Sequence, residues 1–193
     1  MRKLRLIEHI SLDGVIQHSD DDDGFPCSDW TAPYRTPAGR DAMLDAYGES
    51  FDLILGRRTY DLWSGFWPDA PSSPMAYRLN AATKYVVTHR PESLQWGPFE
   101  GLGPDFVEGT RRIKSQDGAD LILSGSSTLT SKLLEHGLAD EVLLVVYPVL
   151  LGTGKRIVAE GTPPCSFELA GTKAMPSGII LSTYRVAGPL KTG

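Results

Sequence analysis

Apolar residues occur along the chain in short blocks that are separated by polar, glycine-containing segments. Blocks of this length, rich in Leu, Ile and Val, are typical of buried β-strands. Helical or loop segments lie between most of them, so the pattern predicts an α/β fold with a mixed central sheet flanked by helices. The predicted strands are 4–10, 52–55, 84–88, 121–123, 141–147, 166–170 and 179–186, and the predicted helices are 39–47, 59–63, 110–115 and one that follows 126–128.

The last two predicted strands follow each other without a helix between them. The segment 171–178, which contains Pro176 and begins and ends in glycine, is predicted to be their turn. An antiparallel β-hairpin should therefore complete the sheet. No repeat or linker divides the chain, so residues 1–193 are interpreted as one domain.

The most informative segment is 121–156, which is predicted to be strand, glycine turn, helix and second buried strand in succession. Gly125 ends the first strand, three hydroxyl residues over 126–128 offer N-caps, and Gly137 ends the helix. Unpaired backbone N–H groups at such a helix start favour an anion, so the turn is a candidate phosphate site. An ordinary capped helix between two core strands is the alternative interpretation.

Two other predicted strands end in cationic residues. The strand 52–55 ends at Gly56 and is followed by Arg57 and Arg58, and the strand 84–88 continues into His89 and Arg90. Ligands in open α/β sheets bind outside the carboxyl ends of the strands, so the three strand ends together indicate a polyphosphate cofactor. Solvated arginines, or arginines paired with nearby acids, remain the alternative for each segment by itself.

Composition and charge exclude several classes of function. The 193 residues are 41% hydrophobic and 22% charged, with a formal net charge of −5, which is typical of a globular protein and gives no basic footprint for nucleic acid. The longest apolar run, 142–151, is interrupted by Pro148 and is shorter than the roughly 20 residues of a membrane span. The N-terminal segment has no uninterrupted apolar region like that of a signal peptide. We therefore expect no nucleic-acid or membrane partner, and a cytoplasmic location.

Candidate metal ligands and nucleophiles are scattered. Cys27 and Cys165 lie far apart without a CxxC motif, so neither a metal site nor a disulfide is predicted. The run 19–24, with four consecutive Asp, is predicted to be a solvated loop, because an EF-hand needs spaced acids and a distal Glu. No histidine lies near a serine in a recognisable catalytic motif.

Four motifs, in this order and spacing, carry a resemblance to a known family: SLDGVI, LILGRRTYDLW, KYVVTHRP and SGSSTLTSKLLEHGLADEVLLVVYPVLLGTGKR. Together they resemble the dihydrofolate-reductase-like superfamily. The run 137–141 and the PVLLGTGK segment are similar to the branch related to the C-terminal reductase domain of the bifunctional riboflavin-biosynthesis deaminase/reductase. One departure is Ser124, which stands where dihydrofolate reductases usually carry the first glycine of a pair. The deaminase motif of the bifunctional enzyme is absent from the sequence.

The resemblance implies a three-layer dihydrofolate-reductase-like fold that binds NADPH and reduces a small heterocyclic or ribosyl substrate, such as 5-amino-6-(5-phosphoribosylamino)uracil. A homodimer is also implied, with exposed apolar surface expected near 145–151. The implied cofactor-binding residues are Ile10, Ile16, Gly56, Arg57, Arg58, Thr59, Thr88, His89, Arg90, Gly125, Ser126, Ser127, Thr128 and Leu129.

The substrate side is less defined. Trp63 and Phe66 are candidates for a pocket wall, although aromatic residues at this spacing are also common in cores. A folate or pterin reductase would need a carboxylate on the first helix, for which Asp41 is the weak catalytic candidate and Asp45 its neighbour. Solvated helix residues are the alternative for both. A module that binds NADP(H) without catalysis is the remaining alternative.

Overall fold

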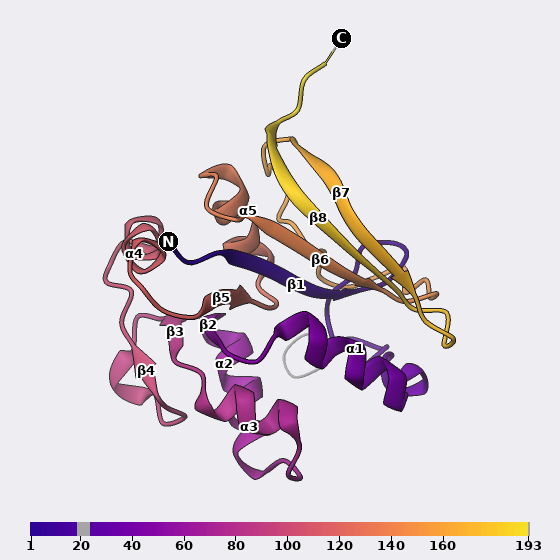
Figure 1. Cartoon of the computed structure of the whole chain (residues 1–193), viewed down its shortest axis with the longest axis horizontal. Coiled ribbons are helices and arrows are strands. Elements are labelled where there is room, and N and C mark those ends of the chain that lie inside the picture. The colour runs from indigo at the N-terminus through magenta and orange to yellow at the C-terminus, as the bar shows by residue number, and fades with distance from the viewer. Residues whose placement is uncertain (19–23, 193) are drawn as a thin grey trace.

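Eight strands form one mixed sheet in the computed structural model, which describes residues 1–18 and 24–192 (Figure 1). Across the sheet the order is β4-β3-β2-β5-β1-β6-β8-β7. Neighbouring strands from β4 to β6 run parallel, whereas β8 runs antiparallel to both β6 and β7. The strands are β1 (Leu4–Ile10), β2 (Phe51–Gly56), β3 (Lys84–Val87), β4 (Phe99–Glu100), β5 (Asp120–Leu123), β6 (Glu141–Val146), β7 (Cys165–Ala174) and β8 (Ile180–Pro189).

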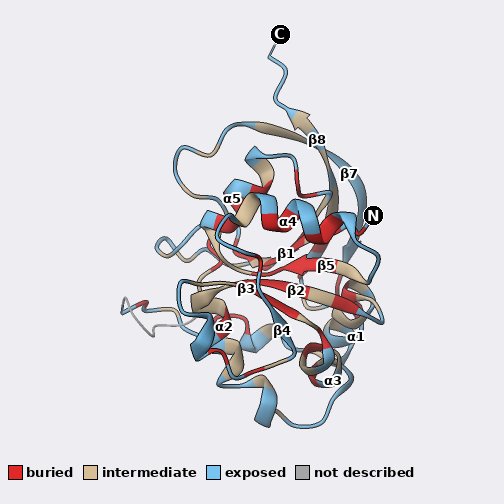
Figure 2. Cartoon of the chain, turned by 90° about the vertical axis from the view of Figure 1, so that its left-hand side faces the viewer, coloured by how far each residue is buried: buried red, intermediate tan, exposed pale blue. Residues whose placement is uncertain are grey.

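Helices cover both faces of the parallel part of the sheet (Figure 2). One face packs against α1 (Pro37–Tyr47), α2 (Arg57–Ser64) and α3 (Pro74–Ala81), and the other packs against α4 (Phe106–Ser115) and α5 (Ser127–Glu135). The buried residues form two apolar clusters, one on each face. Along β1, for example, Ile7 belongs to the first cluster and Leu6 to the second. Strands buried on both faces read as continuous apolar runs, which is why they were recognisable in the sequence.

Two of the helices that begin earlier than the apolar pattern predicts are capped by side chains. The Thr36 hydroxyl accepts from the Gly39 N–H and starts α1 at Pro37. The Asp105 carboxylate accepts from the N–H groups of Val107 and Glu108, so α4 begins before the predicted start at 110. The predictions missed α3 and the two-residue strand β4.

The C-terminal hairpin is longer than predicted. β7 continues to Ala174 and β8 begins at Ile180, so the prediction that 171–174 belong to the turn was wrong. Gly171 lies in the strand just after a register shift at Leu169, and this β-bulge keeps the pairing going past the glycine. The predicted exposed edge near 145–151 is corrected only in part. Val145 is 2% exposed on β6, which lies inside the sheet, and β7 is the edge strand on this side. Leu150, which follows β6, is 73% exposed.

The run of acidic residues predicted to be a solvated loop falls on 19–23, which lie outside the described residues. None of the described helices combines the length and the apolar composition needed to cross a membrane.

Candidate functional site

Four neighbouring parallel strands, β3, β2, β5 and β1, end at one edge of the sheet. The segments that leave these strand ends contain the predicted cofactor residues: 88–90 after β3, 56–59 after β2, 125–129 after β5, and 10–16 at the end of β1. The sheet therefore brings together segments that the sequence separates widely. This edge is the candidate functional site.

The turns after β2 and β5 are in direct contact. A Cβ atom added to Gly56 would lie 3.0 Å from Ser126 Oγ, and one added to Gly125 would lie 2.8 Å from Thr59 Oγ1. Gly125 also has a φ of +71°, a conformation that L side chains rarely adopt. Both glycines are therefore needed for the two helix starts, α2 and α5, to approach each other this closely.

The start of α5 differs from the predicted hydroxyl cap. Ser126 is the N-cap, in the left-handed conformation with a φ of +64°, and its side chain makes no capping hydrogen bond. The Ser127 hydroxyl donates instead to the carbonyl of Arg156, which ties the loop after β6 to the helix start. Thr128 is exposed and Leu129 is buried. Ser126 therefore gives no support to the alternative interpretation, in which α5 is an ordinary helix capped by a side chain.

Ser124 stands where dihydrofolate reductases usually carry the first glycine of a pair, and here its side chain is held within the fold. It is buried, and its hydroxyl donates to the Ile7 carbonyl over 2.7 Å. The residue is not among those with positive φ, so the conformational freedom of glycine is needed only at Gly125. The hydroxyl thus links β1 to the segment that leaves β5.

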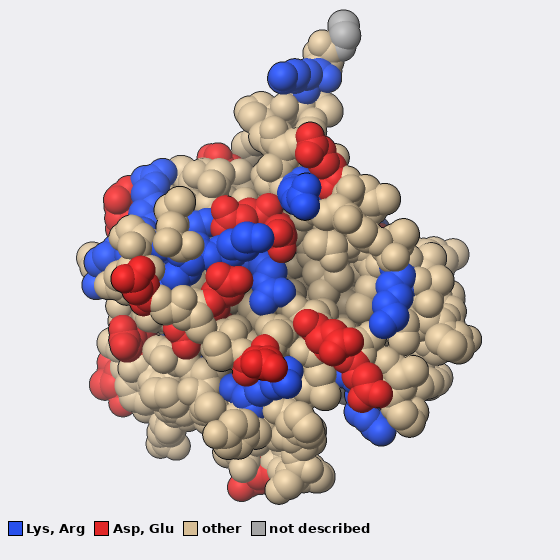
Figure 3. Space-filling model, viewed as in Figure 1, with Lys and Arg blue, Asp and Glu red and all other residues tan. Residues whose placement is uncertain are grey.

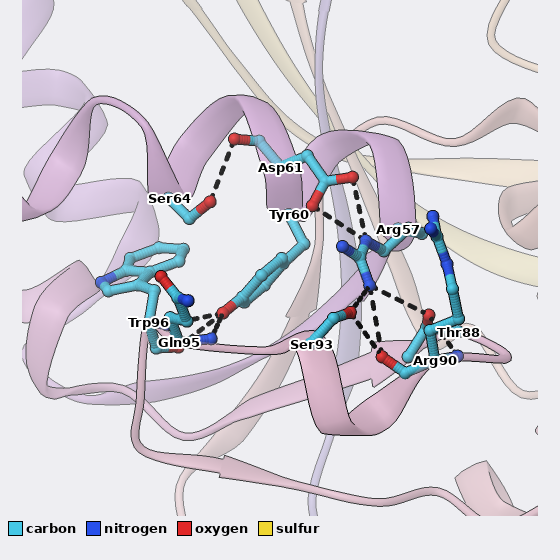
Figure 4. Close-up of polar contacts among 9 residues, drawn as sticks. All are labelled: Arg57, Tyr60, Asp61, Ser64, Thr88, Arg90, Ser93, Gln95 and Trp96. Carbon is cyan, nitrogen blue, oxygen red and sulfur yellow. Dashed lines mark hydrogen bonds and ion pairs between the residues drawn. The ribbon is translucent and has the colours of Figure 1, made fainter.

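Arg57 connects the ends of β2 and β3 (Figure 4). Its guanidinium pairs with Asp61 one turn along α2 and donates to Thr88 Oγ1, to the Arg90 carbonyl and to Ser93 Oγ. His89 and Arg90 are exposed. Arg57 therefore lies beside the other predicted cationic residues, and it is also paired with an acid, as the alternative interpretation held.

Tyr60 holds the following loop against α2. Its hydroxyl accepts from the N–H groups of Gln95 and Trp96 (Figure 4). Trp63, a candidate for the substrate pocket, is half-buried against the core, whereas Phe66 is 57% exposed and packs on Trp67. Trp63 therefore packs partly buried against the core, and Phe66 lies on the surface.

Asp13 organises the loop after β1. Its carboxylate accepts from the Ser11 hydroxyl and from the N–H groups of Leu151 and Gly152. These hydrogen bonds, with that from Ser11 the largest contribution, lower its pKa to about 2. Arg156 donates to the Asp13 carbonyl. The loop that carries Ile16 and the loop after β6 therefore form one wall beside the start of α5.

Glu8 is a buried carboxyl group that the sequence reasoning missed. It is 3% exposed on β1, and its Oε1 atom has no hydrogen-bond partner. Burial raises its pKa to about 8, and a hydrogen bond from the Gly125 backbone opposes this shift. The sequence feature that could have identified Glu8 is its position as a single carboxylate within the apolar block 4–10. Asp41 and Asp45, the carboxylates that the sequence offers on the first helix, are exposed on α1.

A cluster of aromatic rings and histidines was also missed, because its members are scattered in the sequence. His9 Nδ1 lies 2.8 Å from the Tyr147 hydroxyl, and His18 stacks on Trp30 with ring centroids 4.9 Å apart. Burial lowers the pKa of His9 to about 3 and that of His18 to about 4. Both imidazoles are therefore uncharged at neutral pH.

Within 1–18 and 24–192, no group of three or more His, Cys, Asp or Glu side chains could hold a metal ion. Cys27 and Cys165 are free thiols. Basic and acidic side chains are interspersed on the face drawn in Figure 3. That face carries no extended patch of one charge.

Comparisons with known proteins agree with this architecture. A family model described as the RibD C-terminal domain matches residues 104–181. Uncharacterized protein YwjB of Bacillus subtilis (strain 168) is 28% identical over 184 residues, which cover 95% of this chain and 98% of YwjB.

Two solved structures share the fold. A diaminohydroxyphosphoribosylaminopyrimidine deaminase/5-amino-6-(5-phosphoribosylamino)uracil reductase from Thermotoga maritima superposes with a TM-score of 0.67 at 17% identity, covering 96% of this chain and 57% of that one. A dihydrofolate reductase from Enterococcus faecalis, complexed with NADP(H), superposes with a TM-score of 0.59 at 15% identity, covering 96% of both chains. These structures confirm the predicted dihydrofolate-reductase-like fold, and residues 104–181 are similar to the RibD C-terminal domain.

Proposed function

We propose that this protein is an NADPH-dependent reductase that transfers a hydride to a small heterocyclic or ribosyl substrate. The observation that carries the proposal is the contact between the turns after β2 and β5. Gly56 lies so close to Ser126, and Gly125 so close to Thr59, that a Cβ atom on either glycine would crowd its neighbour. Two helix starts held side by side at the carboxyl edge of a parallel sheet suit the pyrophosphate of a dinucleotide.

The residues around these turns fit such a cofactor. Backbone N–H groups at the starts of α2 and α5 would hold the pyrophosphate, because helix N-termini favour anions. The guanidinium of Arg57, held beside Thr88 and Arg90, supplies positive charge next to them. NADPH carries a 2′-phosphate that NADH lacks, and this phosphate would be attracted to the positive charge. We therefore expect the protein to bind NADPH more tightly than NADH.

When bound, NADPH supplies the hydride. The protein itself needs to anchor the cofactor, to orient it against the substrate and to shield both from water. Ile10 and Ile16, both buried, offer apolar surface for the nicotinamide end. The wall held together by Asp13 would keep the loop after β1 over that end and exclude water. These roles need no nucleophile and no metal.

The substrate class follows from the family resemblance, and an aminopyrimidine ribosyl phosphate is the proposed type. A folate or pterin substrate gains no support, because Asp41 and Asp45 of α1 are exposed. The free thiols Cys27 and Cys165 are typical of a reducing compartment, which supports a cytoplasmic location.

Binding and turnover test the proposal separately. The purified protein is titrated with NADPH and with NADH, following nicotinamide fluorescence. NADPH oxidation is then followed by the loss of nicotinamide absorbance, with 5-amino-6-(5-phosphoribosylamino)uracil and with dihydrofolate as acceptors. We expect tighter binding of NADPH than of NADH, and oxidation with the pyrimidine. Equal affinity for the two dinucleotides would contradict the role of the arginines, and binding without turnover on any acceptor would identify a non-catalytic module.

We also propose a homodimer that covers the C-terminal hairpin. The edge strand β7 is exposed along most of its length, and it presents Phe167 at 41% and Leu169 at 60% exposure. A long edge strand with exposed apolar side chains is a liability for a monomer. A second copy packed on this hairpin would remove it.

A further inference from the structure

We propose that Glu8 is a positioning residue whose carboxyl group must hold a proton for an anionic dinucleotide to bind at the turn after β5. This inference rests on the proposed function, because it assigns the phosphate-binding turn to that dinucleotide. Glu8 lies on β1, within the sheet and beside the turn after β5. It does not contact the reacting atoms of the cofactor or the substrate.

Glu8 lies where β1 and β5 separate. The parallel register pairs Leu6 with Leu123, so one further step of two residues brings Glu8 level with Gly125. At that point β5 has ended, and the Ser124 hydroxyl has taken the Ile7 carbonyl as its acceptor. The backbone of Gly125 accordingly lies close enough to the Glu8 carboxyl group to lower its pKa, against the larger effect of burial.

The carboxyl group therefore lies beside one of the backbone donors that a phosphate at this turn would use. Its other oxygen, Oε1, is buried and has no hydrogen-bond partner. An ionised Glu8 would compete with the phosphate for the Gly125 N–H and would repel it through the poorly screened interior. A protonated Glu8 removes the charge, and it leaves the N–H groups at the start of α5 to the phosphate.

Among the residues that the structure describes, no cationic group contributes to the pKa of Glu8. Leu144, its register partner on β6, and Leu129 of α5 are apolar members of the same core face. From the other face of the sheet, the buried phenol of Tyr47 has its pKa raised to about 12, mainly by burial and further by Glu8. Arg5 donates to the carbonyls of Ala46 and Tyr47 at the end of α1. Burial accordingly dominates the titration of Glu8 and raises its pKa to about 8.

The test is the dissociation constant of NADPH, measured by fluorescence titration between pH 6.5 and 9.5, a range chosen to span the pKa of about 8. For the unaltered protein we expect a constant value below about pH 8 and a roughly tenfold weakening for each pH unit above it. Glu8→Gln keeps the shape and cannot ionise, so its affinity should stay nearly constant over the whole range. Glu135→Gln, which removes an exposed carboxylate at the far end of α5, is the matched control and should retain the slope.

A second measurement needs no variant. Calorimetry of NADPH binding at pH 8.5, in buffers of different ionisation enthalpy, should show an uptake of roughly three quarters of a proton for each NADPH bound. Lys84, whose pKa is lowered to about 8 chiefly by burial, titrates in the same range, but it begins β3 at the opposite edge of the sheet. Persistence of the pH slope in Glu8→Gln would therefore assign it to another group.

The outcomes separate the two proposals. If NADPH binds with a pH-independent affinity and no proton uptake, Glu8 has only a structural role, and the proposed function stands. If the slope survives in Glu8→Gln, the assignment to Glu8 is wrong. If NADPH fails to bind at every pH, the proposed function fails and this inference fails with it.

Discussion

Gly125→Ala probes the contact on which the proposed cofactor site depends. The substitution adds one methyl group at a residue whose φ is +71°. It also places that methyl group 2.8 Å from the Thr59 hydroxyl oxygen, on the other turn of the candidate site. Both the backbone conformation and the close approach are therefore disturbed.

The two effects have separate magnitudes. An L residue in the left-handed region costs about 1–2 kcal/mol of unfolding free energy. A contact of 2.8 Å is closer than real Cβ atoms show, so Thr59 or the turn must move, and such overpacking costs about 1–3 kcal/mol more. We expect Gly125→Ala to lose about 2–5 kcal/mol in total.

Gly137→Ala is the matched control. Gly137 follows the same helix, has a φ of +61°, and has no atom within 4 Å of its added Cβ position. Urea unfolding followed by circular dichroism should show the conformational cost of about 1–2 kcal/mol in both variants. Only Gly125→Ala should show the additional loss, and only this variant should weaken NADPH binding.

Equal unfolding free energies and equal NADPH affinities for Gly125→Ala and Gly137→Ala would refute the reasoning, because the contact between the turns would then have no consequence. The double variant Gly125→Ala/Thr59→Ala provides a further check on stability. Removing the Thr59 hydroxyl should recover much of the additional loss, as expected for two residues in direct contact.

Three further predictions concern titration and assembly. The pKa of His9 is lowered from 6.5 to about 3, so its contribution to stability is complete above pH 6.5 and is lost as the pH falls toward 3; urea unfolding should show a shallower acid loss in His9→Gln. The pKa of Glu8 is raised from 4.5 to about 8, so stability should decrease as the pH rises through this window, by at most about 1.4 kcal/mol per pH unit, and Glu8→Gln should flatten the profile. Leu169→Lys should shift the mass measured by light scattering from dimer to monomer, whereas an unchanged dimer would place the interface elsewhere.

Local patterns in the sequence predicted most of the fold. The apolar blocks located the long strands because these strands are buried on both faces, and the glycines marked where β2 and β5 end. The α3 helix was missed although Ser73 caps it and Pro74 begins it, a signal that was present in the sequence. The edge strand β7 was predicted too short because its exposed residues carry no burial pattern.

The residues of the candidate site were predicted only in part. The glycine turns and the arginines were recognisable from their positions after apolar blocks. His9 and Tyr147 were not, because the hydrogen bond between them joins residues separated by 138 positions. Glu8 was overlooked for a related reason: whether a carboxylate in a strand reaches solvent depends on which elements cover that strand.

The sequence by itself determined most of the elements, their order and the turns proposed to bind phosphate, since each of these depends on a few neighbouring residues. The tertiary structure alone decided that β2, β5 and β1 are adjacent, that Gly125 meets Thr59, and that Glu8 lies buried beneath the turn. The physical reason is that strand pairing and burial join residues far apart in the chain. The hydrogen bond from Ser124 to Ile7, across 117 positions, is the contact at which β1 and β5 separate.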